Sequence, residues 1–307
     1  MDVNNTFLYG DLDKEVYMKI PPGFAKQGEH HVCRIHKFLN GLKQTSHNWF
    51  SKFLTVLDAG FSQSKVYHSL FTSCGMSSFT SVLVYVDDII ITGDDPTSIS
   101  ILKCFLHSHF QIKDLGPLKY SLGIEVANSK NGIHLSQQKC ALDIFTDVGF
   151  LGGRHCEFPM EPNLKLTPDN DTLFTDLVVY RHLVECLLYL TITQPDLAYY
   201  VNVLSHFMNT PREPHWQVAL RVVRYIKSSP STGIFFCTTS PLVLTTYSGS
   251  DWAACSTTQR SITGYCTFLS TSPISWKSKK QHAVSRSSVE AKYHVMASTA
   301  CEITWLQ

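Results

Sequence analysis

The chain has 307 residues, which is room for roughly two or three modest domains, and its hydrophobic content of 44% supports buried cores and excludes a disordered polypeptide. Its formal net charge of +1 gives no global electrostatic reason for binding nucleic acid, so any such binding must come from local basic clusters. Two clusters of this kind are Lys277, Lys279 and Lys280, and Arg221, Arg224 and Lys227.

The first part of the chain, residues 2–126, mixes short β-type runs with amphipathic helical patterns, which is typical of an α+β domain. The helical patterns cover residues 49–57 and 101–110. A hairpin gives the strongest signal, because the apolar β-type runs 81–84 and 89–92 flank a short connection. That connection is Tyr85-Val86-Asp87-Asp88, so we predict a hairpin with two adjacent carboxylates at its tip.

Two interpretations of Asp87 and Asp88 are open at this point. Aspartate is a common turn residue, and an acidic pair in a hairpin is most often simply solvated. However, two like charges at one turn repel each other and resist desolvation, and a divalent cation would offset both costs. The second interpretation favours metal-assisted phosphoryl chemistry.

The second part of the chain predicts strands, then helices, then strands again. Residues 159–171, rich in Pro, Asn and Asp, predict a loop, and we place a domain transition there. The predicted helix at 211–226 carries a proline in its first turn. The predicted elements are a strand at 132–135, helices at 137–148, 178–190, 195–208 and 211–226, strands within 233–248 and 264–276, and a helix at 288–305.

The ten cysteines include no Cys-x-x-Cys pair, so we expect no zinc site. Cys104, Cys186 and Cys237 lie in apolar helical or strand contexts, which predicts reduced and buried thiols. No apolar run reaches membrane-spanning length, and no charged and then apolar leader opens the chain. The sequence therefore predicts an intracellular protein without a membrane partner.

A series of motifs along essentially the whole chain resembles the reverse transcriptase of copia-type long-terminal-repeat retrotransposons, followed by the start of its tethered RNase H domain. In that family the palm begins with Asp-Val-x-x-Ala-Phe, and Tyr-Val-Asp-Asp follows later. The matching segments, in family order, are residues 2–12, Gly41-Leu42-Lys43-Gln44 with Trp49, residues 85–88, residues 113–116, Leu122-Gly123-Ile124-Glu125-Val126, residues 180–196, residues 215–227, residues 247–252, residues 261–265 and residues 275–293.

The resemblance implies an RNA-directed DNA polymerase that uses two Mg²⁺ ions held by carboxylates from separate strands. Asp2 and Asp87 would bridge the two ions, with Asp88 as the third acid. Phe7 matches the bulky residue that favours deoxynucleotides, although an ordinary core aromatic is its alternative. Nucleotide and template contacts are also implied at Gly41, Lys43 and Tyr85, and primer support at Leu122 and Gly123.

The RNase H motifs depart from the family pattern at two positions. Gly249 stands where the pattern has an aspartate, and Lys292 stands at the acid that we align with a metal ligand. A lysine there would repel a metal ion. Asp251 and Glu290 remain as nearby acids. They would be the metal ligands only if the motifs were aligned with the family pattern in the alternative register. We therefore expect no cleavage of RNA in hybrids.

The resemblance implies an α+β chain with three regions. They are a reverse transcriptase palm over residues 1–128 with its fingers largely missing, a helical thumb or connection over 129–235, and a truncated RNase H-like α/β domain over 236–307. The expected function is RNA-directed DNA synthesis, weak or absent in this chain. Expected partners are an RNA template, a DNA primer and deoxynucleoside triphosphates, in the cytoplasm, a virus-like particle or the nucleus. The alternatives are a noncatalytic nucleic-acid-binding or structural remnant, and an unfolded product.

Overall fold

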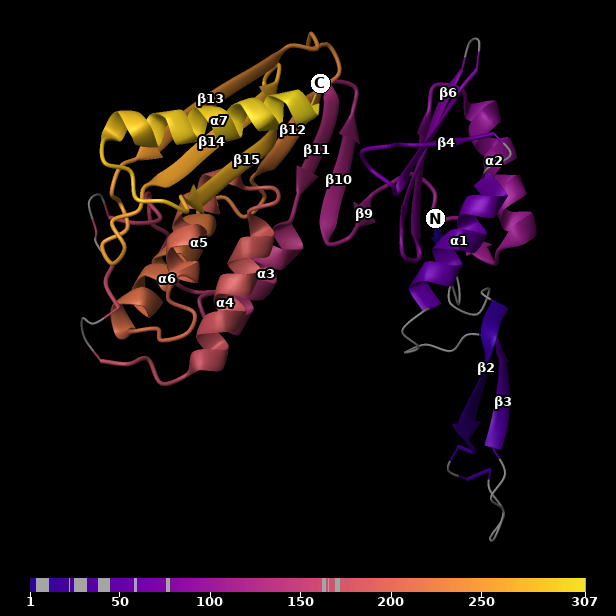
Figure 1. Cartoon of the computed structure of the whole chain (residues 1–307), viewed down its shortest axis with the longest axis horizontal. Coiled ribbons are helices and arrows are strands. Elements are labelled where there is room, and N and C mark those ends of the chain that lie inside the picture. The colour runs from indigo at the N-terminus through magenta and orange to yellow at the C-terminus, as the bar shows by residue number, and fades with distance from the viewer. Residues whose placement is uncertain are drawn as a thin grey trace. The chain divides into compact units, whose positions relative to one another are not determined.

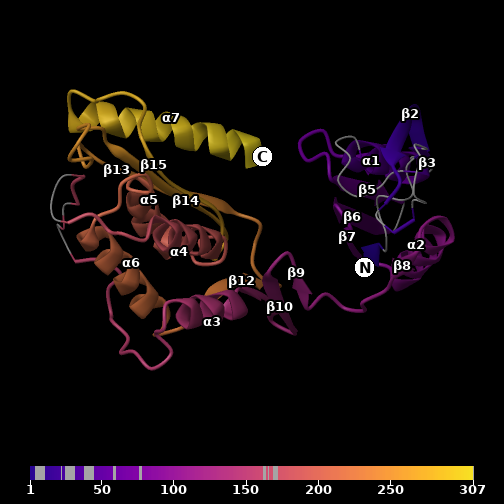
Figure 2. The same cartoon turned by 90° about the horizontal axis from the view of Figure 1, so that it is seen from below.

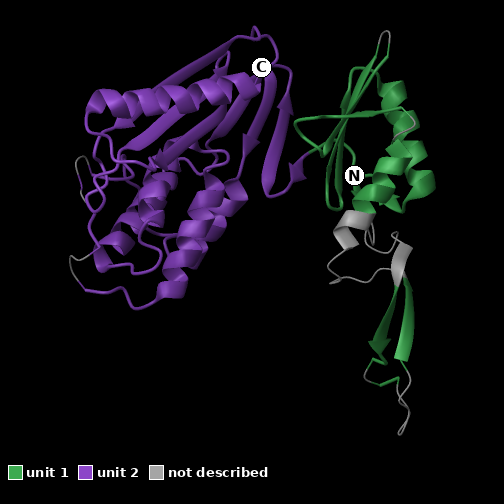
Figure 3. Cartoon of the chain, in the orientation of Figure 1, with its two compact units in different colours: residues 1–118 green, residues 119–307 purple. Residues whose placement is uncertain are grey.

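The computed structural model of the chain divides into two compact units, residues 1–118 and 119–307 (Figure 3). The three functional regions expected from the sequence stay a prediction. The structure describes residues 1–3, 11–21, 23–24, 32–37, 45–57, 60–75, 78–161, 164, 166–168 and 172–306.

The first unit is built on an antiparallel sheet of six strands in the order β4-β5-β6-β7-β1-β8. Helices α1 and α2 pack against this sheet (Figure 1). A separate hairpin consists of β2 and β3. The bounds are β1 Asp2–Val3, β2 Asp11–Lys19, β3 Val32–Lys37, α1 Thr45–Leu57, β4 Ser62–Gln63, β5 Leu70–Cys74, β6 Phe79–Tyr85, β7 Asp88–Gly93, α2 Pro96–His109 and β8 Ile112–Lys113.

The core of the first unit lies between the two helices and one face of the sheet. Trp49 and Phe53 of α1 pack with Phe71 of β5 and with Phe110, which follows α2. The start of helix α2 is stabilised by its N-cap Asp95, whose carboxylate accepts hydrogen bonds from N–H groups of the first turn. Alternating strand residues supply the other side of this core, so the sheet has one buried apolar face.

The second unit contains two antiparallel sheets, ordered β12-β11-β10-β9 and β13-β14-β15, together with five α-helices among its described residues. Figure 2 shows α7 on one side of the sheet β13-β14-β15 and α4 and α5 on the other. The bounds are β9 Tyr120–Ser121, β10 Ile124–Ser129, β11 Gly132–Ser136, α3 Gln138–Asp147, α4 Leu177–Leu190, the 3₁₀ turn η2 Pro195–Leu197, α5 Ala198–Ser205, α6 Glu213–Ile226, β12 Gly233–Cys237, β13 Leu244–Asp251, β14 Ile262–Leu269, β15 Ser272–Lys280 and α7 Ser288–Leu306.

Helices α3 to α6 form the main core of the second unit. Tyr180 of α4 is fully buried there, and its hydroxyl donates to the Leu204 carbonyl of α5 at 2.9 Å. Because burial disfavours the phenolate, the pKa of Tyr180 is raised well above its usual value. Helix α5 of this core lies against β15. The Trp276 indole of β15 donates to the carbonyl of Thr191, the residue after α4, at 3.0 Å.

The structure confirms a mixed α+β fold, and the described strand pairings are antiparallel. The predicted helix over 195–208 begins instead as a 3₁₀ turn at Pro195, and α6 begins at Glu213. The prediction that Cys104 is buried is wrong, because the buried side of α2 carries Leu102 and Leu106 and leaves Cys104 exposed. Cys186 and Cys237 are half-buried, and all ten cysteines are free thiols. Among the described helices, none combines the length and the apolarity that a membrane crossing needs.

Candidate active site

The register of the first sheet sets Asp2 directly opposite Asp88, as Cα partners of β1 and β7. The Met1 amino group donates to the Ile89 carbonyl at 2.8 Å, and the Ile89 N–H donates to the Met1 carbonyl at 2.9 Å. One residue further along, the Val3 N–H donates to the Asp87 carbonyl at 2.9 Å. Asp2 and Asp88 are therefore a non-hydrogen-bonded pair, the type in which facing side chains come closest.

Asp2 and Asp88 lie on the sheet face opposite the helices. Their neighbours Val3 and Ile89 are buried in the core beneath α1 and α2. Since successive strand residues point to opposite faces, the two carboxylates share the other face. Lys113 of β8 is the Cα partner of Asp2 on its other side, so a cation stands next in the same row.

Like charges directly opposite each other destabilise a strand pair. A divalent cation between Asp2 and Asp88 removes that cost, and carboxylate oxygens are the ligands that Mg²⁺ prefers. The donor chemistry therefore fits magnesium, with Asp87 adjacent in the turn. Within the described residues, no three His, Cys, Asp or Glu side chains are placed closely enough to hold a metal ion as they stand.

The turn between β6 and β7 consists of Val86 and Asp87, and Val86 adopts a left-handed φ of 53°. A β-branched residue is strained in this region, so something must hold the turn. The Trp49 indole N–H donates to the Val86 carbonyl at 2.8 Å. Trp49 is itself fixed, since it is 2% exposed and packs edge-on against Phe110. A side chain of helix α1 therefore holds the turn from the core side of the sheet. The carboxylates of Asp2 and Asp88 lie on the opposite side of the sheet.

The remaining predicted polymerase residues have different outcomes. Tyr85 is exposed and is the cross-strand partner of Asp88 at the hairpin end. Phe7, Gly41 and Lys43 lie outside the residues that the structure describes. Their predicted contacts with nucleotide and template stay predictions.

The predicted primer-support residues, Leu122 and Gly123, form the two-residue turn between β9 and β10. Both have positive φ, 50° and 78°, which is the conformation of a type I′ hairpin turn. The Tyr189 hydroxyl of α4 donates to the Leu122 carbonyl. A Cβ on Gly123 would lie 2.6 Å from the same hydroxyl. Glycine is therefore favoured at 123, because its φ of 78° strains other residues and a side chain there would displace the Tyr189 hydroxyl.

The predicted RNase H positions fall on two sides of the sheet β13-β14-β15. Tyr265 of β14 donates to Glu302 of α7 at 3.0 Å, which identifies the face beneath α7. Gly249 and Asp251 pair with Gly264 and Ile262, which are offset from Tyr265 by odd numbers of residues. They therefore belong to the opposite face.

Two features agree with this placement of β13. Asp251 contributes to the raised pKa of Tyr199 of α5, after the larger effect of burial. Lys292 and Glu290 lie on α7, and the Glu290 carboxylate accepts from the Arg286 N–H at 2.7 Å at the start of that helix. Glu290 therefore serves the helix terminus, and the sheet separates it from Asp251.

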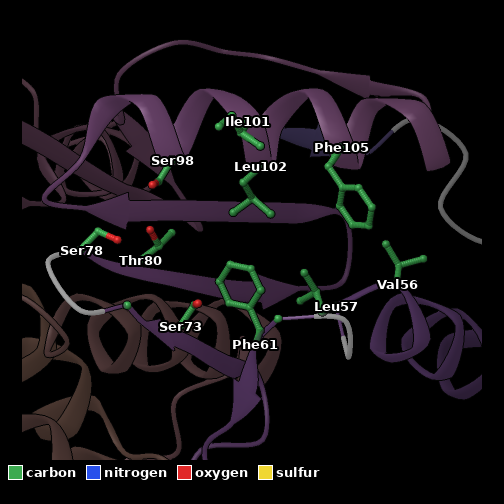
Figure 4. Close-up of a pocket in the computed structure, with 12 residues that line it drawn as sticks. Val56, Leu57, Phe61, Ser73, Ser78, Thr80, Ser98, Ile101, Leu102 and Phe105 are labelled. Atoms are coloured by element: carbon green, nitrogen blue, oxygen red, sulfur yellow. The ribbon is translucent and has the colours of Figure 1, made fainter.

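A cavity of about 360 Å³ opens on the helix side of the first sheet, at the end of the hairpin away from the acids. Figure 4 shows Leu102 and Phe105 of α2 facing Leu57 and Phe61 across it. Thr80 lines the cavity, and four residues of β6 lie between it and Tyr85, so roughly 17 Å of strand separates the two. This apolar space is thus separate from the carboxylates.

Sequence reasoning missed the contacts of three residues rather than the residues themselves. Trp49 and Tyr189 both belong to motifs singled out above, yet nothing local indicates that they bind turn carbonyls 37 and 67 residues away. Lys113 carries no local signal either, because its position beside Asp2 arises from strand pairing.

Known proteins resemble both the first half of the chain and its whole length. The model of the family described as Reverse transcriptase (RNA-dependent DNA polymerase) matches residues 1–162. The whole chain is 42% identical to the retrovirus-related Pol polyprotein from transposon RE1 of Arabidopsis thaliana, and the match covers 21% of that protein. It is 32% identical to the Pol polyprotein from transposon TNT 1-94 of Nicotiana tabacum, covering 24% of it.

A third relative is similar in length to the chain. The putative transposon Ty5-1 protein YCL074W of Saccharomyces cerevisiae is 30% identical over 99% of the chain and 100% of its own length. The chain thus spans about a fifth of the RE1 polyprotein but nearly matches the yeast protein from end to end.

Proposed function

Because the chain belongs to the reverse transcriptase family of copia-type retrotransposon Pol polyproteins, we propose that it extends a DNA primer on an RNA template by using deoxynucleoside triphosphates. The observation that carries this proposal is the cross-strand pair of Asp2 and Asp88 beside the tight turn that holds Asp87. Carboxylate oxygens are the ligands that Mg²⁺ prefers, and a bound divalent cation would offset the repulsion between the two facing acids.

In the proposed reaction the primer 3′ oxygen bonds to the α-phosphorus of the incoming nucleotide. The bond from that phosphorus to the bridging oxygen breaks, pyrophosphate leaves, and the hydroxyl proton passes to solvent. Two Mg²⁺ ions, once bound, supply the positive charge that stabilises the attacking and leaving oxygens. Asp2, Asp87 and Asp88 would hold the ions, and the hydrogen bond from Trp49 to the Val86 carbonyl keeps the turn in one conformation.

A noncatalytic nucleic-acid-binding protein is the second candidate. It is favoured by the described side-chain positions, because the three acids are not gathered into a ready metal site. We also propose that the RNase H-like region cleaves no hybrids, since Gly249 and Asp251 lie across the sheet from Lys292 and Glu290.

The direct test is primer extension by the purified chain on an RNA template, with Mg²⁺ and deoxynucleotides. We expect incorporation that is lost in Asp2→Asn and in Asp88→Asn. Asp143→Asn, at an exposed position of α3, is the matched control and should keep full incorporation. A folded chain that incorporates nothing would favour the noncatalytic candidate.

Thermal unfolding gives a readout that needs no turnover. Asp88→Asn removes one charge of the cross-strand pair. The same variant should lose the rise in melting temperature that Mg²⁺ gives the parent chain. An equal Mg²⁺-dependent rise in the parent, in Asp88→Asn and in Asp143→Asn would mean that this carboxylate pair does not bind the metal.

A further inference from the structure

The cavity of about 360 Å³ on the helix side of the first sheet has a polar end and an apolar end (Figure 4). We call it the helix-side cavity. None of the described residues that line it is charged. Hydroxyl side chains lie at one end, and aliphatic and aromatic side chains surround the rest. The walls include Phe61, Ser73 of β5, Thr80 of β6, and Ile101, Leu102 and Phe105 of α2.

The polar end departs from the alternation of the sheet. Ser73 and Thr80 are Cα partners across β5 and β6, two residues along from the pair of Phe71 and Val82. Because successive side chains of a strand point to opposite faces, Ser73 and Thr80 share the face of Phe71 and Val82. That face carries the core of the first unit. Two hydroxyls therefore occupy positions where the alternation favours apolar side chains.

The hydroxyl of Thr80 is buried but has no protein partner among the described residues. Thr80 is 6% exposed, and neither its hydroxyl nor that of Ser73 makes a hydrogen bond within the part of the chain that the structure describes. The Ser98 hydroxyl at the same end is already committed, because it donates to the Asp95 carboxylate at 2.6 Å. Figure 4 shows the Ser73 and Thr80 hydroxyls pointing from their strands toward α2. A buried hydroxyl without a partner is unfavourable, so a molecule that bonds to Thr80 would remove this cost.

The apolar part of the cavity has an exposed rim on α2. Ile101 is 66% exposed and Phe105 is 36% exposed, and the two lie one helical turn apart, so they form one patch. Leu102 beside them is buried and faces Phe61 across the cavity. Large apolar side chains that stay exposed around a cavity are typical of a site that a ligand covers. The rings of Phe61 and Phe105 favour an aromatic ligand, because aromatic pairs gain more than their buried area alone provides.

We propose that the helix-side cavity binds a small, neutral aromatic alcohol. Its ring would lie among Phe61, Leu102 and Phe105, and its hydroxyl would bond to the Thr80 hydroxyl. The cavity volume of about 360 Å³ is near the lower end of the range of roughly 300–1,000 Å³ for small-molecule sites, which fits a single ring. A nucleotide or a carboxylate is disfavoured, because no charged wall residue would offset the desolvation of its charge. The proposal does not rest on the polymerase reaction.

Hydroxyls near strand ends have a simpler explanation, since Ser73 and Thr80 lie close to the connection between β5 and β6. At such a place water commonly bonds to polar side chains, and one trapped water could bond to Thr80. Water alone does not account for the exposed apolar patch of Ile101 and Phe105 at the other part of the same cavity. One molecule with a ring and a hydroxyl accounts for both ends.

The test is the affinity of the full chain for p-cresol and for toluene, which lacks only the hydroxyl, measured by ligand-observed NMR titration. The solution contains no Mg²⁺, nucleotide or nucleic acid. We expect p-cresol to bind with a dissociation constant of about 1 mM or below. Thr80→Val keeps the shape of the side chain and suits a strand. It should weaken p-cresol binding about fivefold, the ratio expected for one lost hydrogen bond, and leave toluene binding unchanged.

Two further variants complete the test. Thr72→Val is the matched control, because Thr72 lies on the same strand as Ser73 but on the other face of the sheet, and it should change neither affinity. Ile101→Gln alters only the exposed rim, so the core stays intact, and it should weaken both compounds. Melting curves check that each variant is folded.

The proposal would be overturned if the folded parent chain bound neither compound saturably, or if it bound p-cresol and toluene equally well. It would also be overturned by a p-cresol affinity that Thr80→Val leaves unchanged, or by a loss that Thr72→Val shares. A loss confined to p-cresol and to Thr80→Val, together with weaker binding of both compounds to Ile101→Gln, would support it. Because the assay needs no primer or metal, a chain that extends no primer can still pass this test.

Discussion

Replacing Trp49 by phenylalanine tests whether the helix layer holds the acidic turn. The substitution keeps an aromatic ring that packs beside Phe110 and removes the N–H that bonds the Val86 carbonyl at 2.8 Å. Val86 stands at a φ of 53°, so the turn it begins is strained and depends on its surroundings. We expect Trp49→Phe to loosen the turn more than it loosens the rest of the first unit.

The magnitude has two parts. Losing the hydrogen bond costs about 1 kcal/mol, the low end of the range for a carbonyl that loses its donor. The cost is low because Val86 is 44% exposed, so water can replace the indole. The smaller ring removes core atoms at a position that is 2% exposed, for about another 1 kcal/mol. The free energy of unfolding of the first unit should therefore fall by about 2 kcal/mol.

Hydrogen exchange followed by mass spectrometry separates the turn from the core. Phe53→Leu is the matched control, because Phe53 is fully buried in the same cluster but has no bond to the turn. Urea midpoints give the difference in global stability between the two variants. After correction for that difference, peptides that contain the Val3 and Ile89 amides should exchange faster in Trp49→Phe than in Phe53→Leu. Equal exchange of those peptides in the two variants would refute the idea that the indole holds the turn.

Two further predictions concern the second unit. Gly123→Ala should lower the free energy of unfolding by about 1–3 kcal/mol in urea, because its φ is 78° and the new methyl would meet Tyr189, whereas Gly152→Ala has open space and should change little. His215 is 1% exposed and burial lowers its pKa, so its contribution to stability is complete above the ordinary value of about 6.5 and is lost as the pH falls through the lowered pKa. Urea midpoints between about pH 7.5 and 5.5 should fall less in His215→Gln than in the parent, and parallel curves would exclude this role.

The elements of this fold were largely predictable because their signals are local. The hairpin around Asp87 follows from two apolar runs, and the structure has it as β6 and β7 with the acids at the expected place. Helix α4 was expected over 178–190 and spans Leu177–Leu190. Apolar residues that recur with a period of 2 or 3.6 residues are visible within each segment. A strand or helix can therefore be predicted without knowing the segment with which it packs.

The pairings between distant segments were not predictable in the same way. Strand β1 has two residues, too few for any periodic signal, yet it joins β7 to β8 and so creates the pair of Asp2 and Asp88. Strand β12 was expected near residue 233, but its partner β11 lies about a hundred residues earlier. The family resemblance predicted that the acids lie close together. Only the strand register of the structure shows on which face of the sheet Asp2 and Asp88 lie.

The degenerate RNase H positions lead to a last prediction about geometry. A side chain at Gly249 would meet no atom within 4 Å, so Gly249→Asp should fold without a steric cost. The new carboxylate would join Asp251 on the face toward α5, while Lys292→Glu would add an acid on α7 across the sheet. Restoring both acids should therefore create no joint metal site.

We expect the double variant to show the same Mg²⁺ dependence of melting as the parent and to cleave no RNA in a hybrid. Gly249→Asp alone serves as the control for added charge beside Asp251. Metal-dependent stabilisation that appears only when both acids are present would show that residues 249 and 292 meet around the edge of β13. That result would make the lost acids, rather than the strand register, the reason for the expected lack of cleavage.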